Sequence, residues 1–396
     1  MMMNRVTCFI IILSIMFKSI NNIAIKSATL LCFFFGIAIY AQTEAVEIGN
    51  LVERIGETSG LIYFADKLIT HNDSGNTAEL FEIDPDSGEI LRIVQIANAQ
   101  NRDWEDLAQD EDYIYIGDFG NFNGDRTDLR IYKISKAEYL ASDTVTATLI
   151  EFTYEDQSNF TAAPNSDWDA EALFVYEDVL VVLTKQWKSA GTVAYKLSKT
   201  PGDQIAERLD SYQVEGLITG ATYDEFKQQL VLVGYSRLLL PFFVEISGLN
   251  NTSIFSGTIS KLPLNTGIAQ VESIAYSENR YFFTCENYTN TSFQITSLSR
   301  LFFFELAPKI VPQTIDKDIE LILYQPIGPF SLNYELATDD TVFEQAIFDT
   351  AGKRIFYDSN SAIKSGAIDT SSLRPSIYFI IFYLKKGKVS KSFVIR

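Results

Sequence analysis

The sequence has little histidine and little cysteine: one and three residues, respectively, in a chain of 396. Ser/His and Cys/His mechanisms need an imidazole base, and His71 is the single candidate for it. Cys8 and Cys32 lie in the apolar N-terminal region, so export would leave Cys285 alone, without an intramolecular disulfide partner. Zinc sites built from several cysteines and histidines are excluded by the same counts.

Positive charge is also scarce. The 32 Lys and Arg residues face 51 Asp and Glu residues, which gives a formal net charge of −19. A protein that binds the phosphate backbone needs a cationic surface, so we expect no nucleic-acid partner. An acidic surface suits divalent cations, cationic ligands, or simply a solvated extracellular protein.

No apolar run reaches the roughly 20 residues that span a bilayer. Two shorter runs, 6–17 and 28–41, are separated by polar residues, and the second ends in "YAQTE". This plan predicts a secretory signal region over 1–41, cleaved after Ala41, with Met16 as an alternative start. A two-helix membrane hairpin is the alternative. We expect a monomeric mature chain without a stable transmembrane segment.

A pattern of paired strands recurs along residues 42–307. It appears in "SGLIYFADKLITHNDSGN", "EDLAQDEDYIYIGDFGN", "EALFVYEDVLVVLTKQW", "TGATYDEFKQQLVLVGYS" and "ESIAYSENRYFFTCEN". The copies begin at residues 59, 105, 171, 219 and 272, and 13% of the whole chain is aromatic. Regularly spaced strand pairs with almost no helical periodicity predict an all-β fold, a β-propeller with one blade per repeat. The long gap after residue 105 allows five or six blades. An array of β-sandwiches is the structural alternative.

The repeat brings polar residues to one face of the expected propeller. The start of each inner strand and the end of the next strand meet there, because the two run antiparallel. The candidate ligand-binding residues at this channel face are His71, Asp73, Lys185, Trp187, Tyr235 and Asn287. The candidate metal ligands are Glu105, Glu171, Glu272, Asp73, Asp118 and Glu286.

These carboxylates would repel one another if they faced one channel unpaired. A hard cation such as Ca²⁺ would relieve the repulsion through oxygen ligands, so we expect a calcium-type site. The alternative is structural: the acidic residues cap strands, bond backbone amides of the next blade, or face water.

A second module follows the proline-containing segment 308–318, which we interpret as a linker. Residues 319–396 contain short strands separated by the turns "DTAGKR" and "KKGK", which predicts a small Ig-like β-sandwich. The order "AIFDTAGKRIF", "IDTSSLRPSIYFIIFY" and "KSFVIR" resembles the type IX secretion (Por) C-terminal sorting domain of Bacteroidetes. Ser376 stands where that family usually has glycine. The resemblance implies recognition by the type IX machinery, then release from the cell or attachment to its surface.

The repeat region looks like the propellers that travel with such tails, and distantly like phytase-type and SdiA-regulated-like propellers. "DWEDLAQDEDYIYIGDFGNFNGDRTDLRIYKI" and "LITGATYD" carry this resemblance, which implies an acidic channel holding calcium. The function expected from the sequence is a secreted or surface propeller that binds a small-molecule, glycan or protein ligand. The alternatives are a calcium-dependent hydrolase of phytase or esterase type and a structural or adhesive surface protein.

Overall fold

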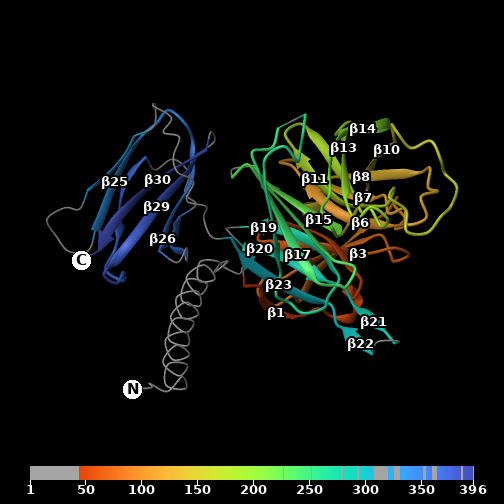
Figure 1. Cartoon of the computed structure of the whole chain (residues 1–396), viewed down its shortest axis with the longest axis horizontal. Helices are drawn as coiled ribbons and strands as arrows, with labels where there is room; N and C mark the ends of the chain where they lie inside the picture. The colour runs from red at the N-terminus through yellow and green to blue at the C-terminus, as the bar shows by residue number, and fades with distance from the viewer. Residues whose placement is uncertain are drawn as a thin grey trace, which may run out of the picture. The chain divides into compact units, whose positions relative to one another are not determined.

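The computed structural model describes residues 44–306, 320–324, 331–350, 354–358, 364–384 and 387–395, except 226, 251, 278, 279, 292 and 293. The signal region 1–41 and the linker 308–318 therefore lie outside the described residues. The described chain is almost entirely β-structure, as the sequence predicts (Figure 1).

Residues 44–306 form five four-stranded blades, the lower of the two numbers that the repeats allow. The first contains β2 (Thr58–Phe64), β3 (Lys67–Asn72), β4 (Glu79–Ile83) and β5 (Ile90–Ile96). The second contains β6 (Trp104–Gln109), β7 (Tyr113–Asp118), β8 (Leu129–Ser135) and β10 (Thr148–Tyr154). The third contains β11 (Ala170–Tyr176), β12 (Val179–Thr184), β13 (Thr192–Ser198) and β14 (Gly202–Tyr212).

The last two blades complete a ring. The fourth contains β15 (Leu217–Asp224), β16 (Gln229–Tyr235), β17 (Pro241–Ser247) and β18 (Thr258–Pro263). The fifth contains β19 (Val271–Ser277), β20 (Arg280–Cys285), β23 (Arg300–Glu305) and, from the start of the domain, β1 (Val46–Asn50). The inner strands lie side by side in the order β2, β6, β11, β15, β19, and β19 lies against β2 again. The ring is therefore closed, and the structure excludes an array of sandwiches in favour of a propeller.

The long spacing between the second and third repeats is explained by an insertion. It contains the short helix α2 (Lys136–Ala141) and β9 (Thr144–Val145), which adds to the edge of the first blade. β10 then pairs antiparallel with β8 and parallel with β14, so the second and third blades share one eight-stranded sheet. The remaining short elements of this region are η1 (Glu53–Ile55), β21 (Tyr288–Asn290) and β22 (Ile295–Ser297).

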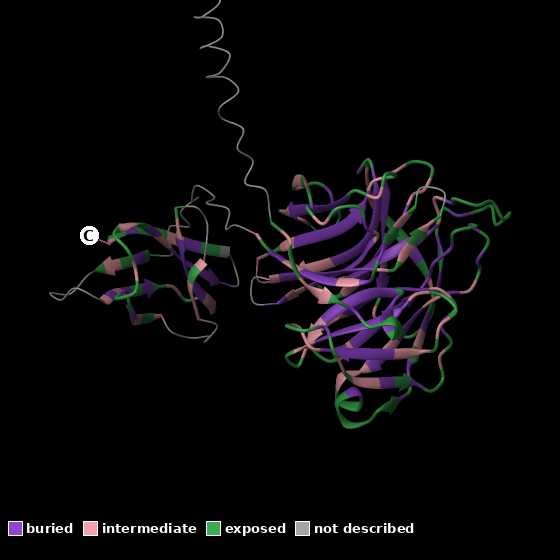
Figure 2. Cartoon of the chain, turned by 90° about the horizontal axis from the view of Figure 1, so that it is seen from below, coloured by how far each residue is buried: buried purple, intermediate pink, exposed green. Residues whose placement is uncertain are grey.

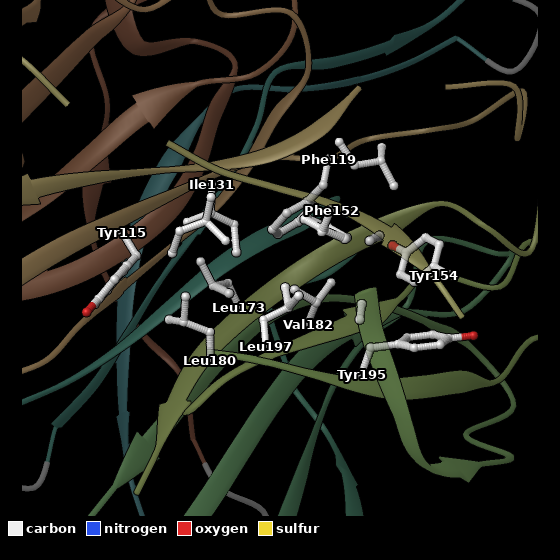
Figure 3. Close-up of a cluster of buried hydrophobic side chains, with 14 of the residues drawn as sticks. Tyr115, Phe119, Ile131, Phe152, Tyr154, Leu173, Leu180, Val182, Tyr195 and Leu197 are labelled. Atoms are coloured by element: carbon white, nitrogen blue, oxygen red, sulfur yellow. The ribbon is translucent and has the colours of Figure 1, made fainter. Parts of the chain in front are cut away.

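The hydrophobic core lies between neighbouring blades. Each of the five blade interfaces has its own cluster of buried side chains. Between the second and third blades, Tyr115 and Phe119 pack with Leu173, Val182 and Tyr195 (Figure 3). The sheets are buried across most of their area, while turns and loops are exposed (Figure 2). The aromatic and β-branched residues of the repeats pack in these interfaces. Sheets arranged around an axis need large side chains to fill the space between them.

The C-terminal region forms a small sandwich of its own. One sheet contains β24 (Glu320–Tyr324), β25 (Ser331–Ala337) and β28 (Ser365–Asp369). The other contains β26 (Val342–Asp349), β27 (Arg354–Asp358), β29 (Ser376–Leu384) and β30 (Gly387–Ile395). Side chains of both sheets share one buried cluster, among them Tyr334 and Phe382. Among the described residues, no helix is long and apolar enough to cross a membrane.

Candidate ligand site at the channel mouth

The site begins with a backbone irregularity that recurs in every blade. Each inner strand shifts its pairing register by one residue close to its start. The residues left out of the pairing are Gly60, Glu105, Glu171, Thr219 and Glu272. A β-bulge turns the extra side chain away from the regular alternation, so the three glutamates leave the pleated face of their own sheets. This is why they gather at the channel mouth.

Five carboxylates form the densest part of the mouth. Carboxylate oxygens of Asp73, Asp103 and Glu105 all lie within 4.8 Å of one another. The same holds for Glu105, Asp169 and Glu171, so Glu105 belongs to both groups. Of these five, Asp103 and Asp169 are absent from the metal ligands that we expect from the sequence. They immediately precede inner strands, and only the closure of the ring brings them to the same place.

Glu105 is the least compensated member of this cluster. The residue is 6% exposed, and no donor among the described residues hydrogen-bonds its carboxylate. Burial, followed by the charges of Glu171 and Asp73, raises its pKa well above the ordinary value. Gly120 leaves the space for this convergence: a Cβ there would lie 2.0 Å from Glu105 Oε1 and 2.4 Å from Asp103 Oδ2. The backbone thus makes room for carboxylates that the chain leaves without a donor.

Lys185 supplies the positive charge at the mouth. Its Nζ lies 2.8 Å from Glu171 Oε1, and both side chains are buried. The ammonium also lies 4.7 Å from the centre of the Trp187 ring and 5.4 Å from that of Tyr235. Trp187 in turn donates from Nε1 to Asp169 Oδ2 at 2.7 Å. Lys185 is therefore held in place by one carboxylate and two aromatic rings.

Glu272 and Glu286 form the other side of the mouth. The Gln270 amide joins them, donating to Glu286 Oε1 at 2.7 Å and to Glu272 Oε1 at 3.2 Å. Burial raises the pKa of each to about 8, and the charge of Asp73 adds to the rise in both. Asp103, on the first side, has its pKa raised to about 7 by burial and by the charges of Asp73 and Asp169.

Two of the expected residues have other partners. Asp118 accepts from Arg126 Nη2 at 2.9 Å, in a buried ion pair that also fixes the loop after β7. The Asn287 side chain packs on Gly56, and its Oδ1 accepts from the backbone of Ser299 at 2.7 Å. The ionic and hydrogen-bonding capacity of these two side chains is used within the protein.

His71 lies inside the protein rather than among the carboxylates. It is fully buried, its Nδ1 lies 2.9 Å from the Asn72 carbonyl oxygen, and its ring meets the edge of Trp104 at 5.5 Å. Burial lowers its pKa to about 4, so the ring is neutral at pH 7. Its place in the fold is that of a packed core residue.

The channel mouth is rich in oxygen atoms that can act as ligands. Seven carboxyl groups converge, counting the five of the dense part with Glu272 and Glu286, and one ammonium accompanies them. Ca²⁺ binds about six to eight oxygen ligands, which come from carboxylates, carbonyl groups and water. Each of the two groups of carboxylates therefore fits a calcium-type ion, and Glu105 is able to take part in either.

Comparison with known proteins adds little to this picture. No family model matches the sequence, and no curated protein matches it significantly. Among solved structures, a GH43_1 enzyme from Xanthomonas citri matches with a TM-score of 0.39 at 12% identity, over 66% of this chain and 91% of that one. A catalytically inactive virginiamycin B lyase from Staphylococcus aureus matches with a TM-score of 0.31 at 11% identity, over 89% and 99% of the two chains. Both likenesses are weak, so the fold assignment rests on the strand topology and the closed ring.

Proposed function

We propose that this protein binds a divalent cation of the calcium type at its channel mouth and uses the loaded mouth to capture an extracellular ligand. The observation that carries the proposal is Glu105, a buried carboxylate without a hydrogen-bond donor among the described residues and shared by two groups of converging carboxylates. A chain that builds such a cluster without a cation must leave part of it protonated. A bound cation would allow all of these carboxylates to ionise together.

The bound ion would supply positive charge to a ligand that approaches from the loops. Asp73, Asp103, Glu105, Asp169 and Glu171 would hold the ion. Lys185 and Trp187 would face the ligand from the third blade, because they follow β12 at the same mouth. The faces between blades are occupied by hydrophobic clusters, whereas the mouth gathers charged and polar side chains.

Thermal melting in calcium and in magnesium tests this proposal. The protein expressed from Gln42 is melted at pH 7.5 in chelator, in 1 mM CaCl₂ and in 1 mM MgCl₂. An affinity near 10 µM would raise the melting temperature in calcium by about 5–10 °C. Glu105→Gln removes one ligand charge and should lose this shift, whereas Glu138→Gln, at an exposed position of α2, should keep it. An equal shift in both variants would contradict the assignment.

We propose further that the chain is exported and acts outside the cell. The support is the order of its parts, a small separate β-sandwich after a propeller, together with the resemblance of 319–396 to type IX sorting domains. In a Bacteroidetes host with this system, the full chain should reach the medium or cell surface. A chain that ends at residue 307 should stay in the periplasm, and its export would contradict the proposal.

A further inference from the structure

Asp106 differs from the carboxylates of the mouth in its burial and in its hydrogen-bond partners. It follows the bulge of β6, and its side chain is completely buried. No cation among the described residues pairs with it, and its hydrogen-bond partners there are backbone N–H groups. Burial raises the pKa of Asp106 well above its ordinary value, and the backbone hydrogen bonds act in the opposite direction. A buried carboxylate is costly unless hydrogen bonds replace its water, so the arrangement of these donors is decisive.

The donors come from four of the five blades. Asp106 Oδ1 accepts from Leu107 N at 2.8 Å on its own strand β6. Oδ2 accepts from Leu173 N of β11 at 2.8 Å and from Ala221 N of β15 at 3.3 Å. Leu61 N of β2 also faces this carboxylate and acts to lower its pKa. The side chain therefore reaches β2 and β11 on the two sides of β6, and also β15, the next strand of the ring. Such a position lies on the axis of the ring.

Most of the positions that correspond to Asp106 carry small residues. After the bulges, the third, fourth and fifth blades carry Ala172, Gly220 and Ser273, and the first carries the apolar Leu61. A Cβ on Gly220 would lie 3.0 Å from Ser273 Cα, and one on Gly60 would lie 3.0 Å from the Asp106 carbonyl carbon. Beyond this layer, a cavity of about 100 Å³ is lined by residues of all five inner strands.

The inner edge of each inner strand has no strand to pair with, since the axis lies beyond it. Its N–H groups still need acceptors, because an unpaired buried backbone group costs as much as a lost hydrogen bond. Several such groups pointing at one spot form a concave site for an anion. We infer that the axis of this propeller is a small-anion site of the carboxylate class, built by backbone N–H groups of the inner strands and filled internally by Asp106.

One consequence follows for the molecule. The carboxylate joins β2, β6, β11 and β15 at one point, in addition to the contacts that neighbouring inner strands make with one another. This inference does not rest on the proposed calcium site, whose residues are different.

Chemical rescue tests the inference on the protein expressed from Gln42. Asp106→Ala should lower the melting temperature by about 5–10 °C, since it leaves several buried N–H groups without an acceptor. Sodium formate should then raise the melting temperature of this variant in a saturable manner, and sodium chloride at equal ionic strength should raise it less. The wild-type protein and Asp106→Leu, which fills the space without an acceptor, should show no difference between the two salts.

Asp106→Asn keeps the experiment decisive if the alanine variant does not fold. The amide retains one oxygen acceptor but turns an NH₂ group toward backbone donors, so its melting temperature should fall below that of the wild type. The inference is overturned if Asp106→Asn is as stable as the wild type. It is equally overturned if a folded Asp106→Ala responds to formate and chloride alike.

Discussion

At the scale of single residues, Lys185 is a buried cation surrounded by carboxylates. Its ammonium is buried, bonded to Glu171, and close to Glu272 and Asp169. Burial alone would lower the pKa of this amine, but the surrounding carboxylates raise it well above the ordinary value. Lys185 therefore stays charged and offsets part of the negative charge at the mouth. A buried ion pair of this kind is costly to break from one side only.

Replacing Lys185 gives the first prediction. Lys185→Met should reduce the free energy of unfolding by about 3–5 kcal/mol near pH 8, because Glu171 is left buried without its cation. Glu171→Gln/Lys185→Met should be more stable than the sum of the two single changes indicates. Urea denaturation of the four proteins measures this. Additive effects, within about 0.5 kcal/mol, would show that the two side chains do not depend on each other.

At the scale of elements, the bulges of the inner strands decide where the glutamates point. Regular pairing would alternate side chains between the two faces of a blade. The one-residue shift removes Glu105, Glu171 and Glu272 from this alternation in three separate blades. The loop after β7 accommodates these carboxylates, since Gly120 has no side chain in the volume that they occupy. The site is thus a property of strand starts and the loops beside them.

Gly120 gives the second prediction. Gly120→Ala places a methyl group within 2.0 Å of the Glu105 carboxylate oxygen, so the carboxylates must move apart. Calcium affinity should fall by about tenfold or more, because the strength of such sites depends on ligand arrangement and charge. Gly49→Ala in β1, where a Cβ meets nothing within 4 Å, serves as the matched control. Equal calcium affinities of the two variants, measured by calorimetry, would contradict the prediction.

The strands can be predicted well from the sequence, but which side chains meet at the mouth can be predicted only in part. Paired apolar strands at regular spacing are a local signal, so the propeller and the acidic strand starts can be predicted. Sequence alignment of the repeats sets Ser59 beside Glu105, whereas the bulge of β2 leaves out Gly60. The pairing of Asp118 with Arg126 and the burial of His71 depend on loop paths and packing across blades. Such contacts join residues of different elements and leave no local pattern in the sequence.

At the scale of the whole molecule, the carboxylates make stability depend on pH. The pKa values of Glu272 and Glu286 are raised to about 8 and that of Asp103 to about 7, mainly by burial. In the unfolded chain these groups titrate near 4. Between pH 4 and 8 the folded protein therefore binds more protons than the unfolded chain, and its stability falls as pH rises. His71 acts in the opposite direction, but only below about pH 6.5, because its pKa is lowered to about 4.

The third prediction concerns the window above the His71 titration. In chelator, the free energy of unfolding should decrease from pH 6.5 to pH 8, as the raised carboxyl groups lose their protons in the folded state. In saturating calcium the decrease should become smaller, since Asp103 and the other carboxylates that hold the ion are already ionised. Urea denaturation at these pH values, with and without calcium, measures both. Stability that rises with pH in chelator would contradict the account.

Closure of the ring is the step that turns separate strand starts into a site. The fifth blade takes its outer strand β1 from the start of the domain, and β19 lies against β2. Thr58 Oγ1 of the first blade donates to Thr284 Oγ1 of the fifth at 3.2 Å, which joins the two ends of the ring. The number of blades, five rather than six, and the position of Asp106 on the axis both follow from this closure. Neither can be obtained from one repeat alone.

The measurement that tests the central claim most directly is a calorimetric calcium titration at pH 7.5, in two buffers of different ionisation enthalpy. The mouth should bind calcium at micromolar concentration in the wild-type protein, and Glu105→Gln should weaken binding by about tenfold or more. The apparent enthalpy should differ between the buffers, because binding displaces protons from carboxyl groups with raised pKa values. No heat in either buffer, or binding that Glu105→Gln leaves unchanged, would contradict a cation site at the channel mouth.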